Sequence, residues 1–184
     1  MSRRFLVVAC VFVLMTAAGA AAQAPSFERP GLITSVGQSS DIAIVKVMLN
    51  TQLKLGLEYK PLAQPADLAG MKTLVIVAGA STKGLGAAGL DITKEMERAT
   101  ALMKAAKAAG ARVLVMHTGG EARRGKTSND VIQLVVPDAD QVVVVAAGNK
   151  DKFFNTLAEK RKVPVVEVEK MSDAGAAVKA IFKQ

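Results

Sequence analysis

The chain has 184 residues, 51% of them apolar, with 24 Lys and Arg against 16 Asp and Glu and a formal net charge of +8. This apolar content excludes intrinsic disorder and is enough for one ordered domain of ~160 residues. One Cys, one His, no Trp and only 4% aromatic residues exclude an internal disulfide, a cysteine or multi-histidine metal site, and the stacking surfaces that bind single-stranded nucleic acid.

Residues 1–24 have the pattern of a secretory signal peptide. Arg3 and Arg4 form a charged start, an apolar stretch reaches Met15, and small residues continue to Ala24. The apolar stretch is well short of the ~20 residues that span a bilayer. We therefore predict that this segment is an export signal and not a membrane anchor.

Cleavage is predicted after Ala22, with Ala24 as the alternative, and it removes Cys10. A lipid anchor on Cys10 is not expected, because the apolar stretch continues past it. The mature chain, residues 25–184, keeps 22 Lys and Arg against 16 acids, a charge of +6, and we predict no stable membrane span in it. We expect it in the periplasm or outside the cell, where a basic protein favours anionic small molecules or surfaces.

Strand-like and helix-like segments alternate along the mature chain, after a lead-in at 25–30 that we predict to be exposed. In chain order we predict a strand at 32–36, a helix at 41–53, a weaker strand at 57–62, a strand at 74–77, a helix at 92–109, a strand at 113–116, a short helix at 128–135, a strand at 142–145, a helix at 150–162, a strand at 163–168 and a helix at 173–183. This alternation predicts a single doubly wound α/β domain. It would be a three-layer sandwich with a mostly parallel sheet of five or six strands, flavodoxin-like or Rossmann-like.

Two segments provide most of the support for this prediction. Four consecutive valines at 142–145 suit a parallel strand that is covered on both faces. The helix at 92–109 follows a suitable N-cap, Asp91, and ends before a suitable glycine, Gly110. Its apolar side is expected at Ile92, Met96, Ala99, Met103 and Ala106, and its charged side at Lys94, Glu97, Arg98, Lys104 and Lys107.

Four loops that follow predicted strands are rich in Gly, Ser, Thr, Asn, Lys and Arg, at 37–41, 79–89, 117–125 and 148–151. In a parallel sheet such loops all emerge at the carboxyl edge, where open α/β folds bind ligands. Glycine lets backbone N–H groups approach a ligand, and each helix N-terminus adds about half a positive charge. We therefore predict a crevice for a small anion, with Arg123 and Arg124 as a bidentate fork for a carboxylate or phosphate.

The predicted ligand-binding residues all belong to these four loops. They are Gly37, Gln38, Ser39, Asp41, Ser81, Lys83, Gly84, His117, Gly119, Gly120, Glu121, Arg123, Arg124, Asn149 and Lys150. The simpler alternative is that the Gly and Ser residues only form turns and N-caps between strands and helices.

Three nucleotide-binding patterns occur, and we discount each of them. Residues 120–127 match G-x-x-x-x-G-K-[ST], but two bulky Arg occupy the turn, residues 128–130 suggest a second loop before any helix, and no strand ends in the expected Asp. Residues 84–89 match G-x-G-x-x-G, but residues 81–83 separate the strand from the glycines and no acid follows the next strand. Residues 149–152 miss the guanine-reading N-K-x-D by one position. No cofactor is predicted.

His117 is the only histidine, and it lies just after the predicted strand at 113–116. This position suits a general base, so a hydrolase or lyase with His117 as acid or base is the alternative to a binding module. Ser39 and Ser81 lack the G-x-S-x-G elbow of a hydrolase nucleophile. Four acids could converge on a hard cation or could simply cap helices and pair with nearby cations, so no metal site is predicted; they are Asp41, Asp91, Glu121 and Asp151.

Together the loops resemble those of a family of uncharacterised exported bacterial and archaeal α/β domains, known as a domain of unknown function. The resemblance covers residues 31–183 and rests on Gly-Gln-Ser-x-Asp from Gly37, Lys-Gly-Leu-Gly-Ala-Ala-Gly from Lys83, Gly-Gly-Glu-Ala-Arg-Arg-Gly from Gly119 and Gly-Asn-Lys-Asp from Gly148. It implies an α/β fold without an assigned activity. It also implies that the two Arg matter more than residues 126 and 127, which vary in the family, so that the match to G-x-x-x-x-G-K-[ST] is accidental.

The sequence therefore predicts an extracytoplasmic domain that binds a small anionic molecule and no nucleic acid. A domain that docks a protein partner without a small ligand is a third possibility. The identity of the ligand and the oligomeric state are not predicted.

Overall fold

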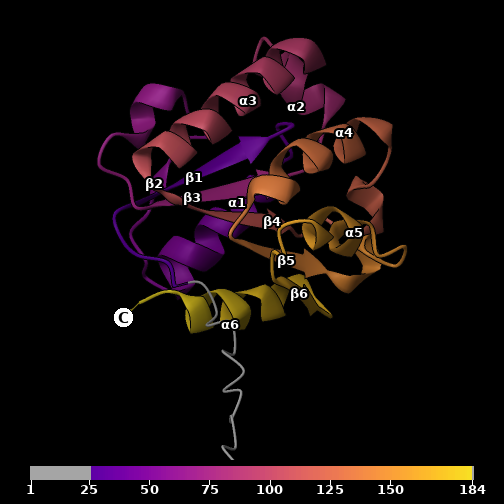
Figure 1. The fold of residues 1–184 in the computed structure, drawn as a ribbon. Helices are drawn as coiled ribbons and strands as arrows, with labels where there is room; N and C mark the ends of the chain where they lie inside the picture. Colours follow the sequence, from indigo (N-terminus) through magenta and orange to yellow (C-terminus); the bar gives the residue numbers. More distant parts are fainter. Residues whose placement is uncertain (1–25, 184) are drawn as a thin grey trace, which may run out of the picture.

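The computed structural model describes residues 26–183, which form a six-stranded parallel sheet. Its strands are β1 (Gly31–Val36), β2 (Glu58–Tyr59), β3 (Thr73–Ala78), β4 (Arg112–His117), β5 (Gln141–Val145) and β6 (Val165–Val168). The order across the sheet is β2-β1-β3-β4-β5-β6, so the chain first moves to one side of β1 and then to the other (Figure 1). The predicted α/β fold with a parallel sheet is confirmed.

Helices cover both faces of the sheet (Figure 1). α1 (Asp41–Lys46), which continues as a π-helical turn (Val47–Gln52), and α6 (Met171–Ile181) pack on one face. α3 (Ile92–Ala109), α4 (Lys126–Val135) and α5 (Phe153–Glu159) pack on the other. A short helix, α2 (Thr82–Ala87), follows β3 where we predicted only a loop.

The central strands are buried on both faces, as the run of valines predicted. Every residue of β1, β3 and β5 is buried. In β5, Val143 belongs to the apolar layer under α1 and α6, whereas Val142 and Val144 belong to the layer under α3, α4 and α5. Alternate residues of one strand therefore fill two separate cores, which explains the unbroken run of valines after Gln141.

The buried side of α3 is rotated relative to the prediction. Its buried residues are Glu95, Arg98, Ala99, Leu102, Met103 and Ala106. Arg98, which we placed on the charged outer side, is thus buried, and Met96 is only partly buried. The helix ends are as predicted: the Asp91 carboxylate accepts the N–H of Lys94 at 2.8 Å, and Gly110 has a φ of 67°.

Several other boundaries differ from the prediction. β2 has only two residues, both paired with β1 at the outer edge of the sheet, instead of the six expected at 57–62. α4 begins at Lys126, two positions before the predicted helix, so the second loop expected at 128–130 does not exist. α5 is shorter than the predicted helix at 150–162.

The segment before β1, which we predicted to be exposed, contributes one residue to the core, whereas Arg29 and Pro30 are exposed as predicted. Phe27 is fully buried and stacks on Phe182, with ring centroids 5.7 Å apart. Its N–H donates to the carbonyl of Ile181 at 2.8 Å, and its carbonyl accepts the N–H of Lys183 at 2.9 Å. The two ends of the described chain are therefore joined beside α6.

The predicted signal peptide, residues 1–24, lies outside the described residues, and its cleavage stays a prediction. Among residues 26–183, no helix is both long enough and apolar enough to cross a bilayer.

Candidate functional site

The four predicted loops meet at the carboxyl edge of the sheet, and the first two are joined through their backbones. The N–H of Ser81 donates to the carbonyl of Gly37 at 2.8 Å, and Gln38 forms an isolated bridge with Ala80. The approach is close enough to require glycine: a Cβ on Gly37, whose φ is +94°, would lie 2.5 Å from the carbonyl oxygen of Gly79. The space between β1 and β3, where open α/β folds commonly hold a ligand, is thus filled by backbone.

His117 lies at the centre of the loops and is fully buried. Its Nδ1 is 2.9 Å from the carbonyl oxygen of Ala78 and its Nε2 is 3.2 Å from that of Gly120. Its ring packs against Phe154, with centroids 5.2 Å apart. Burial lowers the pKa of His117 below its ordinary value of 6.5, and the positive charge of Arg124 lowers it further.

Arg123, in the loop after β4, contacts the start of α1. Its Nη2 donates to Ser40 Oγ at 3.0 Å, and its Nε lies 3.5 Å from the Asp41 carboxylate. Ser39 is buried and its Oγ accepts the N–H of Asp41 at 3.3 Å. Thr118, in the same loop as Arg123, is buried too, and its hydroxyl has no hydrogen-bond partner within residues 26–183.

Arg124 turns to the other side and joins the loops after β4 and β5. It donates to the carbonyl of Gly148, to Asn129 Oδ1 at 2.8 Å, and through Nη1 and Nη2 to both oxygens of Asp151, at 3.1 and 2.9 Å. Its guanidinium carbon is 4.7 Å from the ring centroid of Phe153. The two arginines predicted to form one fork therefore point to different partners.

A cavity of about 230 Å³ lies between the loops after β4 and β5. It is lined by Glu121, Arg124, Ala147, Gly148, Lys150 and Asp151. Glu121 pairs with Lys150 at 2.7 Å, and both side chains are about 70% exposed. The pKa of Glu121 is lowered by the hydrogen bond from Lys150, and the pKa of Asp151 by that from Arg124.

Other predicted residues reach the same edge but lie outside this cavity. Ser81 is the N-cap of α2 and accepts the N–H of Gly84 at 3.1 Å. Asn149 is fully buried; its Oδ1 accepts the N–H of Phe154 at 3.0 Å and its amide donates to Asn155 and Glu167. Lys83 is exposed and forms no salt bridge within the described part of the chain.

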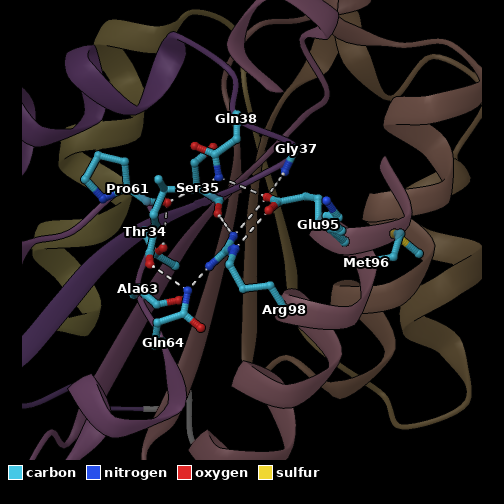
Figure 2. Close-up of polar contacts among 12 residues, drawn as sticks. Thr34, Ser35, Gly37, Gln38, Pro61, Ala63, Gln64, Glu95, Met96 and Arg98 are labelled. Carbon is cyan, nitrogen blue, oxygen red and sulfur yellow. Dashed lines mark hydrogen bonds and ion pairs between the residues drawn. The ribbon is translucent and has the colours of Figure 1, made fainter. Parts of the chain in front are cut away.

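Sequence reasoning missed a buried ion pair behind the first loop, which Figure 2 shows. Glu95 is fully buried and is bonded to Arg98 through both oxygens, at 2.8 and 2.9 Å. Glu95 Oε1 also accepts the N–H of Gly37 at 2.8 Å and the amide of Gln38 at 3.0 Å. Arg98 donates to the carbonyls of Ala63 at 2.7 Å and Ser35 at 2.6 Å.

This pair holds the backbone of Gln38 in the left-handed region, with a φ of 56°, which a residue with a Cβ adopts only when its surroundings impose it. The available signal was the i, i+3 spacing of Glu95 and Arg98 beside Ala99. From the sequence we placed Arg98 on the charged outer side of the helix and did not consider Glu95.

The four acids considered for a hard cation do not converge. Asp41 lies against Arg123, Asp91 caps α3, Glu121 pairs with Lys150 and Asp151 with Arg124. No group of three or more His, Cys, Asp or Glu side chains in residues 26–183 is arranged to hold a metal ion.

One argument against the G-x-x-x-x-G-K-[ST] match fails, because α4 begins directly after Gly125. The others stand. Residues Glu121–Arg123 form a 3₁₀ turn, and Arg124 bonds across to the next loop instead of leaving a cradle for phosphates. Lys126 is 90% exposed at its side chain and pairs with Asp130 at 3.0 Å.

Comparisons with known proteins identify a family but no activity. A family profile described as "Domain of unknown function (DUF6305)" matches residues 28–182. The comparison with curated proteins found no match. Among solved structures, the psychrotrophic esterase EstA from Pseudoalteromonas sp., inhibited by monoethylphosphonate, is 14% identical over 80% of this chain and 82% of that chain. Its TM-score is 0.34, and a likeness this distant supports no conclusion here.

The resemblance read from the four loops is thus matched by the family profile, which spans β1 to α6. The chain belongs to the DUF6305 family of domains of unknown function.

Proposed function

We propose that this domain binds a small anion, a carboxylate or a phosphate, in the 230 Å³ cavity between the loops after β4 and β5. Three of the residues predicted from the sequence line this cavity: Glu121, Arg124 and Lys150. Its size suits a small organic acid or inorganic phosphate.

One observation carries the proposal: the guanidinium of Arg124 is fixed in place, and the group bound to its outer edge is an exposed carboxylate. The Arg124 side chain is only 13% exposed, whereas that of Asp151 is 60% exposed. A bidentate carboxylate on a preorganised guanidinium is the geometry that binds carboxylate and phosphate ligands. We infer that Asp151 occupies the position of the ligand and leaves it when the ligand binds.

Displacing the rim acids costs little. Exposed ion pairs contribute ~0–1 kcal/mol each, so the Lys150–Glu121 pair, exposed on both sides, opens easily. Asp151 is itself mostly exposed and regains water when it leaves Arg124. A released Lys150 then adds a second positive charge beside Arg124. The ligand replaces the two charge-assisted hydrogen bonds that Asp151 makes with Arg124, and its net gain comes from the added contact with Lys150.

The hydrolase or lyase alternative has less support from the geometry. A general acid or base must come within ~2.6–3.2 Å of the proton that it transfers. His117 is fully buried, and backbone carbonyls occupy both of its nitrogens. In this arrangement His117 supports the loops and does not face the cavity.

The test is isothermal titration calorimetry, in which the affinity of the domain for inorganic phosphate, acetate and citrate is measured. Asp151→Asn removes the competing carboxylate, so we expect severalfold tighter binding of at least one of these anions. Arg124→Lys removes the bidentate fork and should weaken the same binding by about tenfold or more.

Asp138→Asn is the matched control, because it removes the same charge from a carboxylate of similar exposure, which pairs with Arg161 outside the cavity. Equal affinity in Asp151→Asn and the unchanged protein, or no binding of any of the three anions, would refute the proposal. Turnover of a simple ester that disappears in His117→Asn would favour the hydrolase instead.

We further propose that the domain acts outside the cytoplasm, since residues 1–24 have the features of an export signal. The mass of the exported protein tests this proposal. A chain that begins at Gln23 or Pro25 supports it, whereas an uncleaved or acylated chain contradicts it.

A further inference from the structure

A groove lies between α3 and α4, two helices that cover the same face of the sheet (Figure 1). Its volume is about 930 Å³, within the range of ~300–1,000 Å³ that is usual for small-molecule sites. Apolar side chains along it come from both helices: Ile92, Met96 and Ala101 from α3, and Leu134 from α4. All four are at least partly exposed to solvent.

A second cavity, of about 540 Å³, continues the groove toward the end of α3. Thr100, Lys104 and Leu134 line both spaces, so the two adjoin each other. From Ile92 to Lys107 the combined groove extends ~22 Å along α3, at ~1.5 Å per residue. Such a shape fits an extended chain better than a compact ligand.

Charge is distributed unevenly along this path. The second cavity is lined by four cations, Lys104, Lys107, Arg112 and Arg161, against two acids. The acids pair with the two arginines, Asp140 with Arg112 and Asp138 with Arg161. Lys104 and Lys107 form no salt bridge within residues 26–183 and are both exposed.

The groove itself is lined by two acids, Glu97 and Asp130, and neither lies in the second cavity. Asp130 pairs with Lys126 at 3.0 Å. An anionic group is therefore attracted to Lys104 and Lys107 and repelled from Glu97. Ile92 and Met96 precede Glu97 on α3, so the apolar side chains continue past this acid, away from the two lysines.

We propose that this groove binds a single-chain amphiphile with an anionic headgroup, such as a long-chain fatty acid. The headgroup lies between Lys104 and Lys107, and the acyl chain follows Met96 and Leu134 toward Ile92. The site is separate from the loops at the carboxyl edge and does not depend on the function proposed for them.

The experiment uses displacement of a fluorescent fatty acid from residues 25–184, with laurate, palmitate, hexadecanol and acetate as competitors below their micellar concentrations. Palmitate should bind more tightly than laurate, by up to about fourfold for each methylene that the groove buries fully. Hexadecanol, which lacks the charge, should bind at least about tenfold more weakly than palmitate, and acetate should not compete.

Two variants locate the site. Lys104→Glu with Lys107→Glu reverses the charge at the headgroup end and should reduce palmitate affinity by more than about tenfold. Ala101→Trp places a large ring in the groove at an exposed helix position and should block the acyl chain. Lys94→Glu, on the same helix but outside both cavities, is the matched control and should bind palmitate normally.

The proposal is overturned if palmitate does not compete, if hexadecanol competes equally well, or if the double lysine variant binds as tightly as the control. Competition by an acidic peptide with apolar side chains, without competition by palmitate, would assign the groove to a protein partner and overturn it as well.

Discussion

At the scale of single residues, two buried polar groups hold the loops at the carboxyl edge in their observed shape. The Glu95–Arg98 pair fixes the loop after β1, and His117 lies between the carbonyl of Ala78, at the end of β3, and that of Gly120, in the loop after β4. Both groups are removed from water, where a polar group is tolerated only if its hydrogen bonds are made. Each of them therefore makes a specific prediction about stability.

Removing one member of the buried ion pair leaves the other uncompensated. We expect Arg98→Ala to lower the free energy of unfolding by ~3–5 kcal/mol, measured by urea denaturation. The double change Glu95→Leu with Arg98→Met removes both charges. It should lower the free energy of unfolding by clearly less than the sum of the losses in Glu95→Leu and in Arg98→Met measured separately. Arg161→Ala, which opens an exposed ion pair, is the control and should lower the free energy of unfolding by no more than ~1 kcal/mol. Losses of similar size in Arg98→Ala and Arg161→Ala would contradict this prediction.

His117 should make stability depend on pH. Its folded pKa lies below 6.5, so the unfolded chain binds a proton at a pH where the folded chain does not. Stability is therefore complete above pH 6.5 and declines as the pH falls from 6.5 toward the folded pKa. His117→Asn should lower stability overall and flatten this slope between about pH 5 and pH 7. Since the chain has no other histidine, an unchanged slope in urea midpoints would show that the explanation is wrong.

At the scale of the elements, the position of α2 depends on a close contact between backbones. A Cβ on Gly84 would lie 2.0 Å from the carbonyl oxygen of Gln38, whereas a Cβ on Gly86, in the same helix, would meet nothing within 4 Å. α2 can approach the loop after β1 only because position 84 has no side chain. This contact is how the loop after β3 is placed relative to the loop after β1.

The two glycines of α2 should thus respond in opposite directions to the same change. Gly84→Ala forces the helix away from Gln38 and should lower the melting temperature. Gly86→Ala removes backbone freedom from the unfolded chain and should raise stability by ~0.4–1 kcal/mol. Thermal unfolding of both variants provides the comparison, and a loss of the same size in each would mean that the contact with Gln38 is unimportant.

The sequence analysis was strongest at this scale. The run of valines and the caps of α3 are local patterns, and the structure confirms both. Two predictions were wrong: a six-residue strand at 57–62, and a loop where α2 lies. The two-residue edge strand β2 is defined by its pairing with β1, and the six-residue helix α2 by its packing on a neighbouring loop. Neither signal is present in the local sequence.

At the scale of the whole molecule, the chain closes on itself. Phe27 and Phe182 stack beside α6, so the first and last described residues contribute to one core. We expect Phe27→Ala to lower the free energy of unfolding by ~3–5 kcal/mol, because a large buried ring leaves a cavity. Val166→Ala, at a side chain that is partly exposed on β6, should cost less than ~1 kcal/mol. Equal urea midpoints for the two variants would show that the segment before β1 is not part of the core.

The sequence by itself determined the alternation of strands and helices and the edge at which the four loops emerge. Both follow from short-range periodicity and from the direction of a parallel strand. The tertiary structure alone decided which charges are paired. Arg98 is buried because its helix rotates toward β1, Arg124 meets Asp151 from the next loop, and Lys104 and Lys107 stay open at the end of a groove. These outcomes depend on which elements meet in space, and local sequence patterns do not specify contacts between residues far apart in the chain.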